Sequence, residues 1–151
     1  MEDTAWGYKV VSMRLFRYYS MSACLLTKIT DSNRFVEYKI GAWTFPSVGY
    51  GPLSYIKDVD DIEPLIHRVF GLWLGDGYTL FVFRCQSLPH EGPRYLWAKS
   101  GSYSPESYDI PCEYSGGIKL VGSSLCLVTN ESLRYLKYED MSCTNYDKKG
   151  I

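Results

Sequence analysis

Strand-like apolar patterning fills the first third of the chain. Residues 8–19 are rich in Val, Met, Phe and Tyr, which favour the half-buried surface of a pleated sheet. Similar apolar positions continue through 22–30 and resume over 34–42. The Thr-Asp-Ser-Asn stretch at 30–33 is a turn signal, so we expect a hairpin there. Pro and Gly punctuate 45–52, which predicts a loop.

One segment changes to the period of a helix. Asp60 can cap this helix, and Glu63 follows at the spacing of a capping box. Pro64 falls in the first turn, where its missing N–H costs little. Gly75 or Gly77 ends the helix. We expect the helix to pack on the sheet through one apolar stripe, made by Ile62, Leu65, Ile66, Val69, Phe70 and Trp73.

Further strand-like segments follow the helix, at 78–85, 94–99 and 118–129. A Pro-bounded turn at 88–93 and a polar, Pro-punctuated loop at 100–111 separate them. The last of these segments predicts a buried strand pair, or one strand broken at its internal Gly-Ser.

The order of strands, helix and further strands predicts an α+β fold, in which a mostly antiparallel sheet carries one main amphipathic helix. Segment 131–139 fits either a short C-terminal helix or a strand, and the polar residues 142–151 predict a frayed tail. Alternating strand–helix–strand units are not evident, which disfavours a doubly wound nucleotide fold. Without a repeat or a linker, the 151 residues indicate a single globular domain, 1–151.

The charge balance bears on the partners of this domain. The formal net charge is −1, and the chain has no sustained block of Lys and Arg. Strong binding to nucleic acid depends on clustered cations, so we do not expect it. The 14 Tyr and 4 Trp favour sheet surfaces, and they also suit protein interfaces because each side chain has an apolar body and a polar end.

Cysteine usage and the start of the chain indicate a compartment. The five Cys are odd in number and form no CxxC pair, and the acidic start Met1-Glu2-Asp3 lacks an apolar signal core. We therefore expect free thiols in a reducing, intracellular environment. No apolar run reaches the roughly 20 residues that a membrane-spanning helix needs.

The chain contains no recognisable catalytic or metal-binding motif. Cys85 and His90 are the only near pair of metal-ligand types, with Cys112 as a third ligand, and their spacing matches no zinc pattern. The acidic residues at 58–63 are explained by helix capping and by the helix dipole. We therefore expect no catalytic residue, no metal site and no cofactor.

The middle of the chain carries a particular order of elements. Over 57–83, an acidic-capped helix containing His67 and Trp73 leads into Gly-Asp-Gly and then the aromatic strand 78–83. Strands precede this stretch, and a Gly-marked apolar strand, 117–128, follows it. The layout resembles the globular core of rhabdovirus matrix proteins.

This resemblance covers about residues 8–130 and implies a viral structural or accessory protein, located in the host cytoplasm or the virion. Two features of the family are absent. The acidic residues 1–3 stand where matrix proteins carry a basic segment for membrane and nucleocapsid, and a Pro-Pro-x-Tyr motif is missing. A matrix-like accessory protein without the basic arm reconciles these facts, and peripheral membrane contact stays open.

Our leading hypothesis is a non-enzymatic interaction or assembly domain that binds a protein partner or associates with itself. Recognition usually falls on loops held by a rigid sheet. We therefore expect the contact residues in the two Pro- and Gly-rich loops, at Tyr50, Leu53, Tyr55, Tyr103 and Tyr108. In the alternative interpretation, these tyrosines only cover the edges of the sheet.

Two rival functions belong to other classes. The first is a small enzyme or ligand-binding domain with a pocket between helix and sheet, whose candidate residues are His90, Glu91, Cys85 and Cys112. The second is a carbohydrate-binding module that uses an exposed Trp43 or Trp97.

Overall fold

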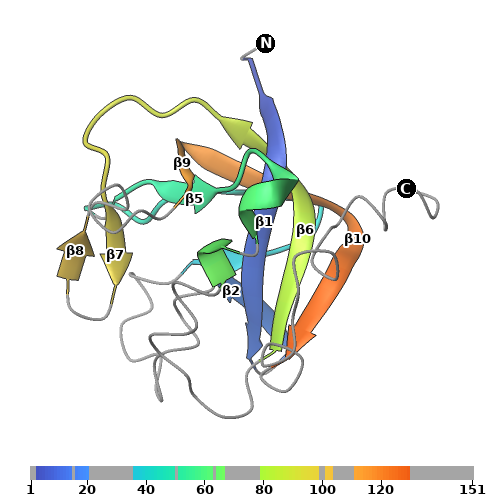
Figure 1. Cartoon of the computed structure of the whole chain (residues 1–151). Coiled ribbons are helices and arrows are strands. Elements are labelled where there is room, and N and C mark those ends of the chain that lie inside the picture. Colours follow the sequence, from blue (N-terminus) through green and yellow to red (C-terminus); the bar gives the residue numbers. More distant parts are fainter. Residues whose placement is uncertain are drawn as a thin grey trace.

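Three long antiparallel strands form the centre of the structure, which is a computed structural model (Figure 1). They are β1 (Ala5–Arg14), β6 (Thr79–Leu88) and β10 (Gly117–Thr129), and β6 pairs with both of the others. The structure describes residues 3–14, 16–20, 36–49, 51–62, 64–66, 79–98, 101–103 and 111–129.

The six-stranded sheet curls until its two ends approach each other. Its strand order is β3-β2-β1-β6-β10-β4, with β2 at Arg17–Ser20, β3 at Glu37–Tyr38 and β4 at Trp43–Thr44. The end strands β3 and β4 are therefore consecutive in the chain, joined only by the turn 39–42. The Thr44 hydroxyl donates to the carbonyl of Glu37 at 3.4 Å, which links the two ends. The sheet is consequently a nearly closed barrel.

The turn that joins the two ends is itself held to the sheet. The N–H of Gly41 donates to the carbonyl of Leu120 on β10 at 2.8 Å, and Ala42 N–H donates to Lys39 at 3.1 Å. Gly41 has a φ of +82°, a conformation that glycine adopts without steric cost. This turn therefore carries the chain from one end strand to the other.

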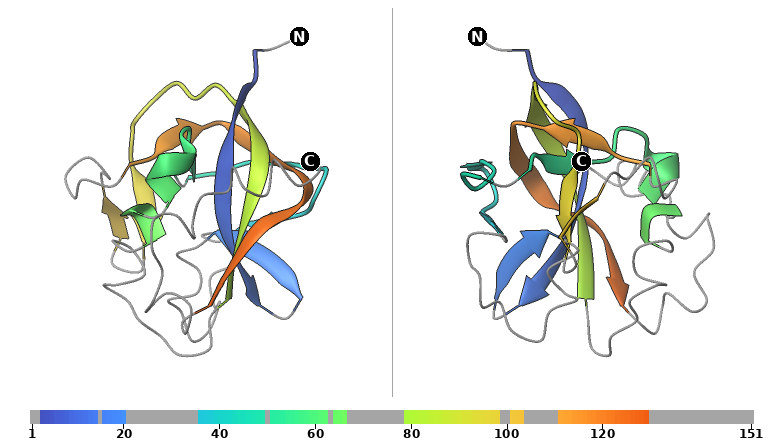
Figure 2. Two further views of the ribbon diagram at one scale, coloured as in Figure 1. Left: turned by 45° about the vertical axis from the view of Figure 1, so that its right-hand side comes forward. Right: turned by 90° about the vertical axis from the view of Figure 1, so that its left-hand side faces the viewer.

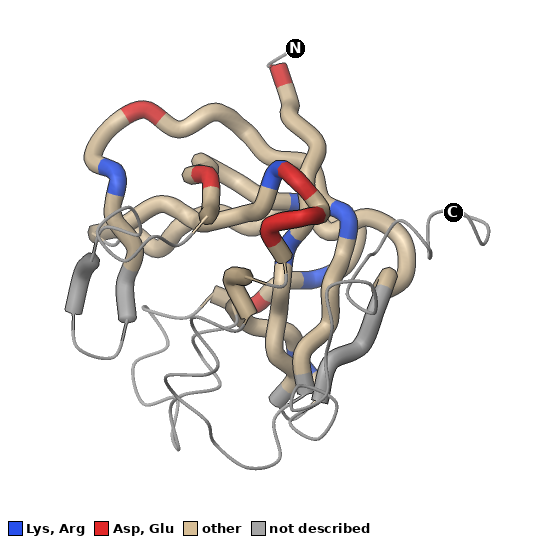
Figure 3. The backbone as a smooth tube through the Cα atoms, viewed as in Figure 1, with Lys and Arg blue, Asp and Glu red and all other residues tan. Residues whose placement is uncertain are grey.

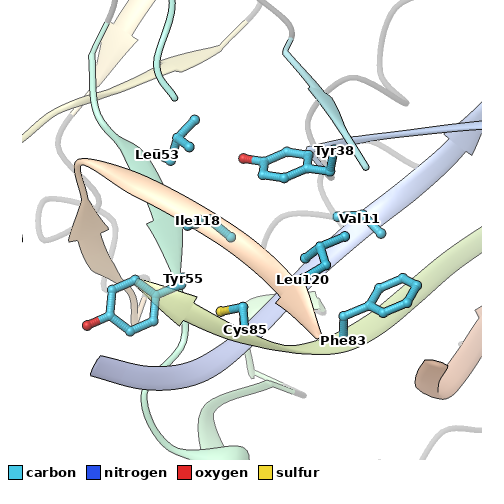
Figure 4. Close-up of a cluster of buried hydrophobic side chains, with 8 residues drawn as sticks. All are labelled: Val11, Tyr38, Leu53, Tyr55, Phe83, Cys85, Ile118 and Leu120. Atoms are coloured by element: carbon cyan, nitrogen blue, oxygen red, sulfur yellow. The ribbon is translucent and has the colours of Figure 1, made fainter. Parts of the chain in front are cut away.

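Alternate residues of the central strands face the barrel interior, as the two-residue period of a strand requires. The interior cluster consists of Val11, Tyr38, Leu53, Tyr55, Phe83, Cys85, Ile118 and Leu120 (Figure 4). Tyr18 packs edge-on against Phe81 and Phe83, with ring centroids 5.5 and 5.3 Å apart. Residues of opposite alternation, such as Val10 and Val82, are also buried, so the sheet is covered on both faces there.

Two small strand pairs complete the described part. The first is β5 (Leu53–Tyr55) with β9 (Glu113–Ser115), and the second is β7 (Leu96–Ala98) with β8 (Gly101–Tyr103). After β5, Ile56 and Tyr8 on β1 exchange backbone hydrogen bonds of 2.7 and 2.8 Å. Gly7 permits this crossing, because a Cβ atom there would lie 2.6 Å from the carbonyl oxygen of Ile56.

The predicted α+β class is wrong, because the chain is mostly antiparallel β. In the described part, the expected main helix is a 3-10 turn, Val59–Asp61, that continues as helix through Ile62 and 64–66. Asp58, rather than Asp60, occupies the N-cap, and its side chain makes no capping bond. The physical reason for the difference is that the sheet covers its apolar interior by curling on itself rather than under a helix.

Several other predictions can be compared with the described residues. The irregularity expected inside the last strand is confirmed, since the β10–β6 register shifts between Val121 and Cys126 and Gly122 has a φ of +74°. The strand-like pattern of residues 8–19 falls on two strands, β1 and β2, and β8 lies within the segment predicted as the loop 100–111. The turn at 30–33, the helix end at Gly75 or Gly77, and segments 131–139 and 142–151 lie outside the described residues.

No helix among the described residues combines the length and the apolar character that crossing a membrane requires.

Candidate functional site

The structure describes the side chains of only two residues predicted as contacts. Leu53 and Tyr55 are each 9% exposed and belong to the interior cluster, so their side chains are core rather than contact surface. Tyr103 ends β8, and only its backbone is described. Tyr50 and Tyr108 lie outside the described residues. The expected loop site therefore has no two members that the structure brings together on the surface.

The candidate residues Cys85, His90 and Cys112 of the rival enzyme interpretation lie in different environments. Cys85 is fully buried, and burial raises the pKa of its thiol to about 12, so the thiol keeps its proton at neutral pH. The Nε2 atom of His90 is 3.0 Å from the carbonyl oxygen of Pro93, and Cys112 is half-buried. Within the part of the chain that the structure describes, no three His, Cys, Asp or Glu side chains gather as metal ligands.

A groove crosses the outer surface where the two ends of the sheet meet. This seam groove has a volume of about 440 Å³ and is lined by β2, β3, the turn 39–42 and β4. The side chains that give it chemical character are Arg17, Tyr19, Glu37, Lys39, Trp43 and Phe45. The groove exists because β3 and β4 close the barrel without forming a regular ladder with each other.

Large apolar side chains are exposed along the groove and next to it. Phe45, in the groove wall, is 56% exposed, while Ile40 and Val48 in the same stretch of chain are 49% and 99% exposed. The Phe45 ring lies over Gly117, where a Cβ atom would come within 3.0 Å of it. An apolar group of this kind on the surface marks an interaction site more often than an isolated exposed residue does.

The charged groups of the seam groove are mostly basic. Arg17 and Glu37 approach to 3.8 Å, but the Arg17 side chain is 64% exposed, so this ion pair stabilises the fold little. Lys39 adds a second cation to the groove. On the adjacent strand, the ammonium of Lys119 lies 5.2 Å from the ring centre of Trp43, a cation–π contact.

An acidic segment occupies another part of the surface. Asp58, Asp60 and Asp61 belong to the 3-10 turn, and we call this segment the acidic turn (red in the tube of Figure 3). In the right-hand view of Figure 2, the acidic turn and the loop that follows β4 lie on opposite sides of the sheet. One molecule therefore carries a basic, aromatic groove and an acidic turn that face in different directions.

The barrel interior holds a lysine that the sequence did not single out. Lys9 is 4% exposed, and its ammonium donates to the carbonyl oxygen of Ser54 at 2.6 Å and lies 5.3 Å from the ring centre of Tyr38. Burial lowers the pKa of Lys9 to about 8. Because Lys9 lies among core residues rather than in an open pocket, its contacts indicate a structural role.

Comparison of the chain with protein-family models, with curated proteins and with solved structures found no match. The resemblance to rhabdovirus matrix proteins therefore stays a prediction.

Sequence reasoning missed most of the seam groove. Trp43 was singled out, but as a sugar contact, while Tyr19, Lys39 and Phe45 were assigned to strands and a loop. Their proximity depends on the barrel closing, and no local pattern encodes that. The one available signal was the exposed apolar pair in the Pro- and Gly-rich loop 45–52, namely Phe45 and Val48.

Proposed function

We propose that this chain is a non-enzymatic assembly domain, and that the seam groove binds a second copy of the chain. The observation that carries the proposal is the exposure of Phe45 in the wall of a groove that also contains Tyr19 and Trp43, with Val48 exposed three residues further along the chain. Aromatic and arginine side chains dominate the energetics of protein interfaces. Covering this surface would remove large apolar groups from water.

Charge complementarity favours a second copy as the occupant. The groove carries Arg17 and Lys39, whereas the acidic turn carries Asp58, Asp60 and Asp61 on a different side of the molecule. A groove that receives the acidic turn of another molecule makes a head-to-tail contact, which produces rings or filaments rather than a simple twofold dimer. A matrix-like structural role, as the sequence resemblance implies, belongs to this class of function.

The enzyme alternative has less support from the geometry. A catalytic thiol needs a lowered pKa, while burial shifts the pKa of Cys85 in the opposite direction. Enzymes also gather perturbed groups in an accessible cleft. The strongly perturbed groups Lys9, Tyr38 and Cys85 lie instead in the packed interior.

The test is the molar mass by light scattering after size exclusion, across protein concentration and at low and high salt. The proposal expects growth above the 17.3 kDa chain mass as concentration rises, with less growth at high salt because ions screen the contact. Phe45→Ser should weaken the growth while changing the free energy of unfolding by less than about 1 kcal/mol, since the ring is half exposed.

A mixing experiment separates head-to-tail assembly from other modes. Lys39→Gln disables the groove and leaves the acidic turn, while Asp60→Asn with Asp61→Asn disables the turn and leaves the groove. Each variant alone should stay monomeric, and their mixture should give a species of twice the 17.3 kDa chain mass and nothing larger. A monodisperse monomer for the unmodified chain under every condition would rule out self-association as the function.

A further inference from the structure

The hairpin between β1 and β2 has an unusual tip. Arg14 and Arg17 are the last register pair, and Phe16 lies in the turn between them. Phe16 is 94% exposed, and its φ is +65°. The tip lies at the end of the sheet opposite the N-terminus (Figure 2).

The positive φ of Phe16 destabilises the folded state. Two-residue hairpin loops favour Asn-Gly, because glycine and asparagine accept a positive φ, whereas a bulky side chain in that region is strained. The strained residue is also an aromatic ring left in water, although aromatic rings are ordinarily buried. Strain that folding does not require is found at functional positions.

Charged and apolar side chains lie next to Phe16 in the hairpin. Arg17, the cation that follows Phe16 in the chain, belongs to the last register pair of the hairpin. The partner of Arg17 is Glu37 at 3.8 Å, a distance at the limit of an ion pair, and 64% of the Arg17 side chain is exposed. Met13, which precedes Arg14, is a further apolar side chain with 39% exposure.

We propose that this hairpin tip docks on an anionic phospholipid surface, with the Phe16 ring at the acyl boundary and Arg17 at the level of the lipid phosphates. An aromatic ring beside a cation is a composition that favours a membrane interface. Arginine pairs with phosphate through two parallel hydrogen bonds, and basic residues are attracted to anionic leaflets. A convex tip needs no preformed pocket in order to enter a bilayer surface.

Docking by one ring and one arginine is weak and reversible, because firm anchoring to a membrane takes more than one such signal. Several tips on one assembly would add their contributions, so the number of copies would set the avidity. The proposal concerns the single tip, however, and does not depend on assembly.

The experiment measures partitioning of the full chain onto vesicles by flotation at low salt. One vesicle type is phosphatidylcholine alone, and the other contains phosphatidylserine as well. The proposal expects binding to the anionic vesicles only. Arg17→Gln should lower this partitioning by about fivefold, and Phe16→Gly should lower it by about tenfold or more.

Two variants distinguish a loss of membrane binding at the hairpin tip from misfolding and from a contact elsewhere on the surface. Phe16→Gly relieves the backbone strain, so a loss of binding in a protein that is at least as stable cannot come from misfolding. Trp6→Ser removes a half-exposed ring near the start of β1, at the other end of that strand from the hairpin tip and outside the seam groove, and should leave partitioning unchanged.

Three outcomes would overturn the proposal. The first is no binding of the unmodified chain to anionic vesicles. The second is equal binding to both vesicle types, which would remove the role of charge. The third is equal binding by Phe16→Gly and the unmodified chain, or an equal loss in Trp6→Ser, which would move the contact away from the hairpin tip.

Discussion

The ammonium group of Lys9 lies 2.6 Å from the carbonyl oxygen of Ser54, inside the barrel. The same group is 3.3 Å from the Ser54 hydroxyl, so one buried cation joins β1 to β5. Burying an ammonium is costly even when it is hydrogen-bonded, and burial lowers the pKa of Lys9 from 10.5 to about 8. Cys85, in the same interior, has its pKa raised from 9.0 to about 12.

These two shifts predict a stability maximum at alkaline pH. Between pH 8 and 10.5 the unfolded chain holds a Lys9 proton that the folded chain lacks, so stability rises with pH. Between pH 9 and 12 the folded chain keeps a Cys85 proton that the unfolded chain loses, so stability falls. We expect the free energy of unfolding to rise by about 1 kcal/mol from pH 8 to 9 and to fall above pH 10.5, where the raised pKa of Tyr38 adds to the fall.

Denaturant unfolding with a reducing agent, measured at each pH, checks this profile. Lys9→Met keeps the length of the side chain and removes the ammonium, so the rise between pH 8 and 9 should vanish in that variant. Cys85→Ala should shift the alkaline fall to higher pH. A flat profile in the unmodified chain, or the same rise in Lys9→Met, would show that Lys9 is not a buried cation.

Gly7 is predicted to be intolerant of any side chain. An added Cβ would lie 2.6 Å from the Ile56 carbonyl oxygen and 2.6 Å from the Tyr55 ring, and the backbone cannot retreat without breaking the Tyr8–Ile56 pair. Gly7→Ala should therefore cost about 3 kcal/mol of unfolding free energy, as an overpacked core does. Thermal unfolding would measure the cost.

Gly49→Ala is the control for this prediction. Gly49 has a φ of +86° and no atom near the added Cβ, so only the backbone cost of about 1 kcal/mol applies. Equal losses of stability in both variants would contradict a special role for the β1–β5 crossing.

The β-strands were largely predictable, because their signals are local. Strand-forming apolar residues predicted β6 and β10, and an internal Gly-Ser predicted the break that corresponds to the register shift after Val121. Among the described residues of the predicted stripe, Ile62 and Ile66 are fully buried and Leu65 is half-buried. The local pattern also indicates that Leu53 and Tyr55 are core residues, because they alternate with Ser54 as the buried residues of a strand do.

The closure of the barrel was not predictable from the same signals. It depends on β3 and β4, two strands of two residues each, which meet β2 and β10 far away in the sequence. The hairpin turn beside Phe16 was missed because Leu-Phe lacks the turn residues that such a loop favours. Neither the seam groove nor the hairpin tip could therefore be predicted from local sequence patterns.

Ser115 is predicted to be the most sensitive polar position of the interior. Its buried hydroxyl oxygen accepts from the Ser87 hydroxyl at 2.7 Å and from the Gly117 N–H at 3.1 Å, and its own proton goes to the Gly117 carbonyl at 2.7 Å. Ser115→Ala leaves these groups without that partner and should cost about 2 kcal/mol. Ser87→Ala should cost less, and a double-mutant cycle should give a coupling of about 1 kcal/mol. Additive effects of the two substitutions would contradict a shared hydrogen bond.

Phe16 provides the one substitution that should stabilise the fold. Glycine accepts the φ of +65° at this position without strain, and the 94% exposed ring makes little packing contact that could be lost. Phe16→Gly should therefore raise the free energy of unfolding by about 1 kcal/mol, measured by denaturant titration. Phe16→Ala keeps a Cβ and the strain, so it should change stability by less than half as much. If Phe16→Gly instead destabilises the chain, the ring packs in solution and the hairpin tip is a structural element. Stabilisation would mean that the phenylalanine is retained at a cost to folding, as expected of a side chain that binds something outside the molecule.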